Sequence, residues 1–225
     1  MLRLAEITQH AYSIGLAHHA VGTLYLAKGE WARAQALLDR QVAVLRAANL
    51  GVELAMALAL SARALVHLGE PTEALARIRE SEQLLQGTGE PVENPGFHLS
   101  LARASLVLGR LDAVQTREGH ALTSSGGRVG YIPQARQLLG DLASHPDRFD
   151  PKRAEIHYRE AFDLAGRRGM RPVLAQVHLG LGTMYRRTGA RERAAEHLQA
   201  AVTELSDLDM GYWLAQAEAE NEALR

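Results

Sequence analysis

Residue types that support common kinds of protein chemistry are scarce or missing in this chain. Its 225 residues include no cysteine, which excludes disulfides, zinc–thiolate sites and thiol nucleophiles. Of its 25 basic residues, only Lys28 and Lys152 are lysines. Neither lysine follows a glycine in the GxxxxGK[ST] arrangement that cradles nucleotide phosphates. The sequence therefore contains no P-loop.

Long apolar runs are missing as well. No stretch approaches the roughly 18 residues of a membrane span, and residues 1–12 lack the charged start and apolar centre of a signal peptide. The formal net charge is −1, so no overall charge attracts the chain to nucleic acid or to an anionic membrane. We therefore expect a cytoplasmic protein with neither a nucleic-acid nor a membrane partner.

Motifs of catalytic and metal sites are not found either. The ten histidines form no HExxH pair, and the adjacent His18 and His19 would point about 100° apart on a helix. No GxSxG elbow is present. The GLG at 180–182 lies in an expected helix and favours close packing over dinucleotide binding, whereas the loop at 124–130 is either an anion-binding loop or a plain connector. We expect no enzyme activity, no cofactor and no metal.

The residues that are abundant favour helices. Apolar residues make up 47% of the chain and aromatic residues 5%, with much alanine and leucine. This mixture is typical of close helix-on-helix packing rather than of a β-sandwich, which is rich in β-branched and aromatic side chains. Runs of alternating β-branched residues are missing too, so we predict an almost wholly helical chain without a sheet.

A repeat of 40 residues organises the sequence. Gly29, Gly69 and Gly109 each follow an apolar segment, Phe149 occupies the next position, and Gly189 the one after it. A glycine after an apolar helix supplies a left-handed C-cap that lets the chain reverse. We therefore predict two helices per repeat, with repeat units at about 12–50, 51–90, 91–128, 129–170 and 171–209 and a capping helix in 210–225, all within a single domain of residues 1–225.

Small residues recur at fixed distances from these glycines, and in the fourth unit Gly140 takes this role after a slip of two residues. Small side chains let two helix backbones approach closely. We predict that six of them are buried at helix crossings: Gly22, Ala34, Ala74, Ala154, Gly182 and Ala194.

The repeats resemble the tetratricopeptide repeat (TPR) family. The fifth unit matches its pattern at Leu181, Gly182, Tyr185, Gly189, Ala194, Leu198 and Ala201, and the first unit keeps Gly22, Tyr25, Gly29, Trp31, Ala34 and Leu38. The second and third units match loosely. The resemblance implies an all-α, right-handed superhelix of about five helix pairs.

A narrower resemblance covers most of the chain and is densest over 137–220. This part is similar to the C-terminal repeat region of bacterial class III adenylate/guanylate cyclases fused to an AAA-type ATPase module. The cyclase and ATPase modules themselves have no counterpart here. The resemblance implies the regulatory or sensing arm of a multidomain signalling protein.

In the TPR family, the first helix of each pair lines a concave binding face. Transferred through the glycine register, this implies that a protein or peptide partner contacts His19, Arg63, His67, Arg103, Gln176, Thr183, Arg186 and Arg187. The lysine- and asparagine-based carboxylate clamp of chaperone-binding members is missing, and Arg63 and Arg103 could equally serve only to solvate a helix face or pair with nearby carboxylates.

Two further hypotheses stay open: a free-standing adaptor that binds its partner in the groove, and an accessory domain that spaces or oligomerises enzymes. Met1 falls in the middle of a repeat. We therefore expect a longer array upstream in the intact protein, and either self-association through the N-terminal end or fraying of residues 1–12 in this chain.

Overall fold

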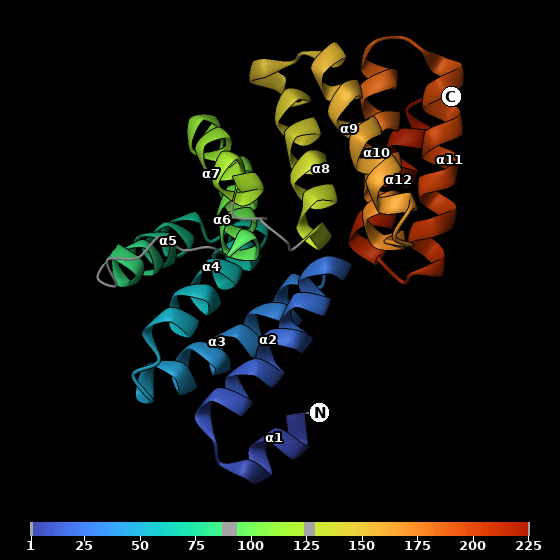
Figure 1. Ribbon diagram of the computed structural model, residues 1–225. Coiled ribbons are helices and arrows are strands. Elements are labelled where there is room, and N and C mark those ends of the chain that lie inside the picture. Colours follow the sequence, from blue (N-terminus) through green and yellow to red (C-terminus); the bar gives the residue numbers. More distant parts are fainter. Residues whose placement is uncertain (1, 87–93, 124–128, 225) are drawn as a thin grey trace. The chain divides into compact units, whose positions relative to one another are not determined.

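The computed structural model describes residues 2–86, 94–123 and 129–224, and the regular elements in these ranges are all helical (Figure 1). The prediction of a helical chain without a sheet is confirmed for these residues. Their α-helices are α1 (Leu2–Thr8), α2 (Ala11–Lys28), α3 (Trp31–Ala47), α4 (Gly51–His67), α5 (Pro71–Gln86), α6 (Pro95–Val107), α7 (Leu111–Thr123), α8 (Ile132–Ala143), α9 (Pro151–Gly166), α10 (Arg171–Arg187), α11 (Arg191–Asp207) and α12 (Gly211–Glu222).

Left-handed residues end the helices at 40-residue intervals. Gly29, Gly69, Gly109 and Gly189 follow α2, α4, α6 and α10 with φ between 69° and 80°. A residue without a Cβ adopts this conformation at little cost, which is why the repeat is visible in the sequence. The second helices use the same device, since the positive-φ residues Asn49, Gly169 and Asp209 follow α3, α9 and α11.

The fourth helix pair departs from this scheme. Phe149, at the position where the other pairs have glycine, is extended, with φ −61°, and follows a short 3-10 helix at Pro146–Arg148. A Cβ on Gly140 would lie 2.5 Å from the Tyr158 ring, whereas Gly22 faces Leu38 and Gly182 faces Leu198. The first partner lies 18 residues along the chain and the other two lie 16. The fourth pair therefore has the two-residue slip that the sequence indicates.

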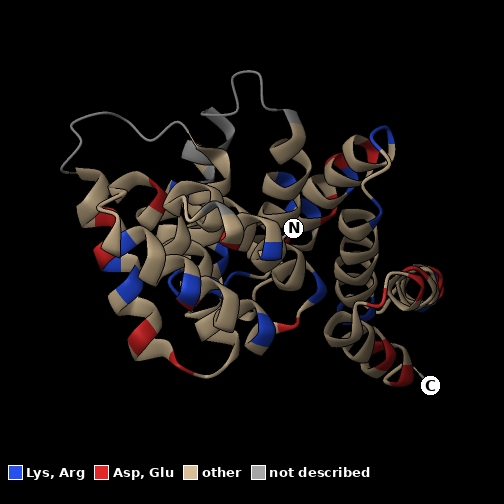
Figure 2. Ribbon diagram, turned by 90° about the horizontal axis from the view of Figure 1, so that it is seen from below, with Lys and Arg blue, Asp and Glu red and all other residues tan. Residues whose placement is uncertain are grey.

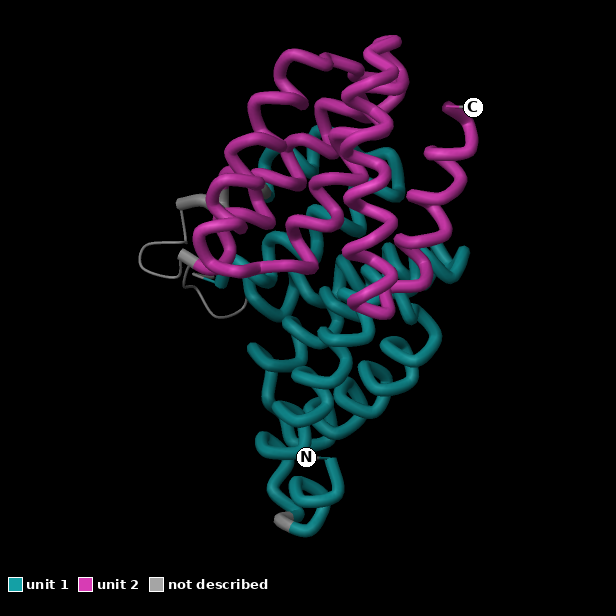
Figure 3. The backbone as a smooth tube through the Cα atoms, turned by 90° about the vertical axis from the view of Figure 1, so that its right-hand side faces the viewer, with its two compact units in different colours: residues 1–117 teal, residues 118–225 magenta. Residues whose placement is uncertain are grey.

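The chain divides into two compact units, Met1–Arg117 and Glu118–Arg225, and the boundary falls within α7 (Figure 3). In unit 1, α4 packs against α2 and α6, so these three form a first-helix layer. The α3 and α5 helices pack on α4 from the second-helix layer, and α1 packs on α2. Unit 2 repeats the pattern, with α8, α10 and α12 in the first-helix layer and α9 and α11 in the second.

The six small residues predicted at helix crossings are all buried, and Ala34, Ala74, Ala154 and Ala194 have no exposed surface. The side chain that each glycine faces explains why no larger residue fits. A Cβ on Gly182 would lie 2.6 Å from Leu198 Cγ and 3.2 Å from the Leu198 backbone nitrogen. Close backbone approach therefore fixes how tightly α10 packs on α11.

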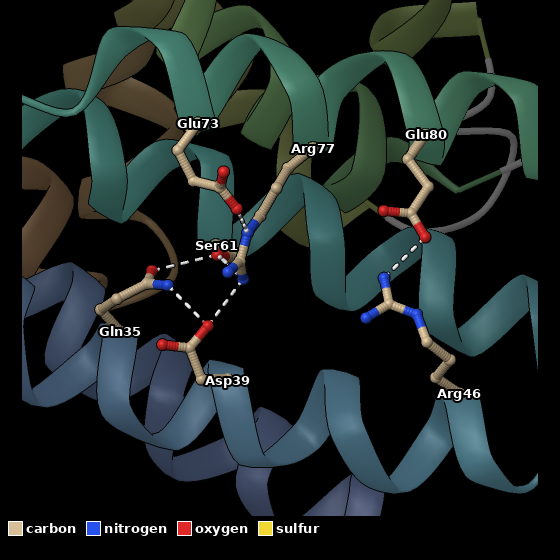
Figure 4. A network of polar contacts seen from close by, with 7 residues as sticks. All are labelled: Gln35, Asp39, Arg46, Ser61, Glu73, Arg77 and Glu80. Carbon is tan, nitrogen blue, oxygen red and sulfur yellow. Dashed lines mark hydrogen bonds and ion pairs between the residues drawn. The ribbon is translucent and has the colours of Figure 1, made fainter.

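Polar contacts also join the helices of unit 1 (Figure 4). Arg77 of α5 forms ion pairs with Asp39 of α3 at 2.8 Å and with Glu73 at 3.1 Å, and it donates a hydrogen bond to Ser61 of α4 at 2.7 Å. Ser61 in turn donates to Gln35 of α3 at 3.0 Å. The Arg77 guanidinium thus ties three successive helices together.

Acidic and basic positions are interspersed along most helices (Figure 2). Two ion pairs join equivalent helices of successive repeats in their own units. Arg46 of α3 binds Glu80 of α5 at 2.6 Å, and Arg186 of α10 binds Glu220 of α12 at 2.5 Å. Both pairs span 34 residues, so in each unit the charges follow the repeat.

Candidate binding surface

The α4 helix of unit 1 is buried almost all around. Between Leu54 and Val66 every residue is buried except Met56 and Arg63, and His67 at the end of the helix is also partly accessible. These three positions lie seven and four residues apart, so they share one side of the helix. Solvent reaches α4 along this stripe.

The α6 helix leaves a comparable opening. From Leu99 to Ser105 its residues are buried except Arg103. Arg103 lies 40 residues after Arg63, at the same position of the next repeat, and α4 packs against α6. The charge of Arg103 acts on both Arg63 and His67. The fold therefore brings together three of the residues that the sequence indicated: Arg63, His67 and Arg103.

Arg63 is a partly buried guanidinium without a carboxylate partner in the described ranges. Its Nη2 lies 3.5 Å from the Leu26 carbonyl oxygen of α2, at the outer limit for a hydrogen bond. Burial, and then repulsion by Arg103, lower the pKa of Arg63 to about 9. The loss of hydration at this site is therefore not balanced by an opposite charge from the protein residues that the structure describes.

The His67 imidazole is held against an aromatic ring. It stacks on Trp31 with ring centroids 3.8 Å apart and an angle of 6° between the planes. Burial, followed by repulsion from Arg63 and Arg103, lowers the pKa of His67 to about 4, so the ring is neutral at physiological pH. The sequence analysis did not connect Trp31 with this surface, because no spacing rule links the start of α3 to the end of α4.

His19 lies on α2, in the same first-helix layer. It is partly buried, and burial lowers its pKa. Its carbonyl oxygen accepts a hydrogen bond from Thr23 Oγ1 at 2.8 Å. Thr23 stands 40 residues before Arg63, so the arginine position of α4 and α6 is occupied by a neutral side chain on α2.

The predicted residues of unit 2 have different surroundings. Gln176 and Thr183 are partly buried on α10, and Gln176 Oε1 accepts a hydrogen bond from Gln137 of α8 at 3.1 Å. Arg186 is bound to Glu220 of α12. Arg187 lies over the Phe149 ring with its guanidinium carbon 3.7 Å from the centroid, and it donates a hydrogen bond to the Ser144 carbonyl oxygen.

The two units therefore use their arginines differently. In unit 2 the guanidinium groups of Arg186 and Arg187 contact neighbouring helices and loops of the same unit. In unit 1 Arg63 lies near a second cation and has no acidic partner in the described segments. An unneutralised, partly accessible pair of arginines is suited to binding an anionic group.

Histidines also meet between α10 and α11. The Nδ1 atoms of His178 and His197 lie 2.9 Å apart, so one ring donates a hydrogen bond and the other accepts it. Phe162 contacts His178 edge-on, and Tyr185 stacks on His197. Within residues 2–86, 94–123 and 129–224, no three histidine, aspartate or glutamate residues are grouped so that they could hold a metal ion.

A membrane-crossing helix is not found among the described residues, since each is too short or too polar. Comparison with known proteins adds no assignment to these observations: no family model matches the chain, and no curated protein is significantly similar to it.

Proposed function

We propose that this chain is a non-catalytic scaffold that binds a protein or peptide partner on the first-helix layer of unit 1. The observation that carries the proposal is the access that α4 and α6 leave. Both helices are otherwise buried, and the accessible positions along their middle are arginines 40 residues apart. A purely structural position of this kind would favour an apolar or an ion-paired side chain, because an uncompensated charge is costly to desolvate.

The architecture that best fits this role is a TPR-type right-handed superhelix of paired helices. Its support is the 40-residue interval of left-handed residues, together with small residues at the helix crossings. Stacked repeats expose an extended surface made of equivalent positions, which is how such arrays bind partners.

Within that role, the sequence resemblance favours the regulatory arm of a multidomain bacterial signalling protein of the cyclase/ATPase type. A free-standing cytoplasmic adaptor is the alternative, and the same surface would serve it. The two differ in what the partner is. A regulatory arm binds in order to change the activity of domains on its own polypeptide, whereas an adaptor binds a separate protein and needs no attached domain.

Site-specific photo-crosslinking tests the scaffold proposal. A benzophenone side chain replaces Met56, which lies on the accessible stripe of α4, and the labelled full chain is irradiated in an extract of its natural host. The matched control carries the same group at Arg79, an exposed residue of α5 in the second-helix layer. We expect an adduct of defined mass only from position 56, and excess unlabelled chain should suppress it.

Equal adducts from positions 56 and 79, or none from position 56, would contradict binding on the first-helix layer. Mass spectrometry of the adduct separates the two finer hypotheses. A crosslink to a domain of the same gene product supports the regulatory arm, and a crosslink to an unrelated protein supports the adaptor.

A further inference from the structure

Two arginines at equivalent positions of neighbouring helices form the strongest unassigned feature of the molecule. Arg63 and Arg103 lie on α4 and α6, which pack directly against each other in unit 1. Each is partly accessible where the residues around it on its own helix are buried. The pair is therefore embedded in the layer, yet a solute can reach it.

The donors of Arg63 are poorly used by the protein. A guanidinium has five N–H groups arranged in a fixed fork. In the part of the chain that the structure describes, Arg63 makes one long contact, the 3.5 Å approach to the Leu26 carbonyl. Arg77, one helix further along, shows the usual arrangement for comparison, with Asp39, Glu73 and Ser61 as acceptors.

The charges around the pair are all of one sign or neutral. The groups that act on Arg63 are its own burial and Arg103, and those that act on His67 are its burial and both arginines. Neither set contains a carboxylate. Two guanidinium groups close enough to repel each other destabilise the folded chain unless an anion lies between or beside them.

We propose that Arg63 and Arg103 bind a phosphate group. The proposal rests on the scaffold function above, because the first-helix layer is then the surface that meets the ligand. The arginine fork matches phosphate oxygens with paired hydrogen bonds. A phosphate monoester carries a charge of about −1.5 to −2 at neutral pH, which balances two guanidinium groups, whereas a single carboxylate balances one.

The repeat itself provides an internal comparison. The position of Arg63 and Arg103 is occupied by Thr23 one repeat earlier and by Thr183 two repeats after Arg103. The arginines that follow Thr183, Arg186 and Arg187, have protein acceptors already. The proposed site is thus confined to α4 and α6 and is not a general property of the repeats.

The ligand could be a small phosphomonoester or a phosphorylated segment of a partner protein, since both present the same group. Isothermal titration calorimetry of the purified full chain separates these sources. The probes are inorganic phosphate, a phosphoserine peptide, the same peptide unphosphorylated, and sodium glutamate as the carboxylate control, all at one ionic strength. A phosphopeptide that binds at least about tenfold tighter than inorganic phosphate identifies a protein source, and equal affinities identify a small molecule.

The variant that tests the site is Arg63→Gln/Arg103→Gln. Its matched control, Arg79→Gln/Arg110→Gln, removes two exposed arginines of the same unit and gives the same net charge. We expect the site variant to bind phosphate at least about tenfold more weakly than the wild type and the control to bind like the wild type. Circular dichroism establishes that both variants fold, and the single variants Arg63→Gln and Arg103→Gln replace the double variant if it does not.

Unchanged phosphate affinity in the folded site variant would overturn the proposal. So would glutamate that binds as tightly as phosphate, or phosphate that does not bind the wild type. These outcomes are independent of the scaffold test, because crosslinking at position 56 can succeed while phosphate fails to bind. In that case the surface binds a partner through other chemistry.

Discussion

Two arginines of unit 1 carry the same charge in opposite surroundings. The Arg77 side chain has 16% of its surface exposed and is bound by Asp39 and Glu73. Arg63 is partly buried as well, but near Arg103 and without a carboxylate among the described residues. A buried charge stabilises the fold only when its lost hydration is replaced by acceptors. The two residues should therefore respond in opposite ways to removal of the charge.

Replacement of each by methionine, which keeps an apolar stem, measures this difference. We expect Arg63→Met to raise the free energy of unfolding by about 1 kcal/mol, because repulsion and desolvation are removed. Arg77→Met should lower it by about 1–2 kcal/mol, a value reduced from that of a fully buried pair because Asp39 and Glu73 are about half exposed. Urea denaturation gives both values. Destabilisation by Arg63→Met would mean that the residue has a structural role that the contacts do not reveal.

The alanines at the helix crossings test the packing directly. Ala194 of α11 has no exposed surface, whereas its neighbour Ala195 is exposed. Ala194→Leu should lower the free energy of unfolding by about 1–3 kcal/mol through overpacking. Ala195→Leu on the same helix should change it by less than about 0.5 kcal/mol. If the two variants unfolded at the same denaturant concentration, α11 would not pack through its alanine face.

At the scale of helices, the ends carry most of the repeat signal. Gly189 follows α10 with φ 80°, and Gly166 is the last residue of α9 without a positive φ. A Cβ would meet no neighbouring atom at either position. The difference between the two glycines is thus one of backbone conformation alone.

The same substitution should consequently have opposite effects at these two sites. Gly189→Ala forces a Cβ into the left-handed region and should cost about 1 kcal/mol of unfolding free energy. Gly166→Ala should gain up to about 1 kcal/mol, because alanine has the higher helix propensity. Thermal denaturation of the two variants checks the prediction. A stabilised Gly189→Ala would show that the chain can reverse after α10 without a left-handed residue.

The contact between α10 and α11 contains the histidine pair, which makes it sensitive to pH. Burial, then repulsion by His197, lowers the pKa of His178, and Glu204 and Glu196 oppose this. Burial lowers the pKa of His197, with Glu196 opposing and Arg159 reinforcing the effect. The folded chain therefore binds fewer protons than the unfolded chain, whose histidines have an ordinary pKa of 6.5.

Stability from this pair is fully present above pH 6.5 and is lost as the pH falls below it. Urea denaturation at about pH 7.5 and about pH 5 should show the loss, with each pKa unit worth about 1.4 kcal/mol. His178→Gln or His197→Gln should reduce the pH dependence, and the double variant should reduce it little further, because one contact is involved. A wild-type pH slope retained in both single variants would assign the effect to other histidines such as His67.

At the scale of the whole chain, exposed apolar side chains gather on its first two helices. Leu4 and Ile7 of α1 are 71% and 77% exposed, and Leu16 and Leu24 of α2 are 56% and 57% exposed. Apolar surface of this kind on a water-soluble protein tends to find a partner. We expect either self-association through α1 and α2 or fraying of α1.

Light scattering coupled to size-exclusion chromatography tests self-association, and Leu4→Glu/Ile7→Glu should shift any dimer towards monomer. Hydrogen exchange over residues 2–28 tests fraying, which should appear as protection weaker than that of α10. A strict monomer in which α1 is as protected as α10 would contradict both expectations.

The helices and their ends could be read from the sequence because their causes are local. A left-handed glycine, an apolar segment before it and a small residue at a fixed distance are properties of neighbouring residues, and they repeat every 40 positions. For this reason the expected helix boundaries agree with the observed ones to within one or two residues. The slip at Gly140 was visible for the same reason.

The composition of the candidate site depends on contacts between helices, which the repeat period does not specify. The sequence indicated Arg63, Arg103, Arg186 and Arg187 on equal grounds, but the fold pairs Arg186 with Glu220 and lays Arg187 on Phe149. It stacks His67 on Trp31 and leaves Arg63 beside Arg103 without a carboxylate from the described residues. A charged side chain finds its partner according to which helices pack closely around it, and that is a property of three-dimensional packing rather than of spacing along the chain.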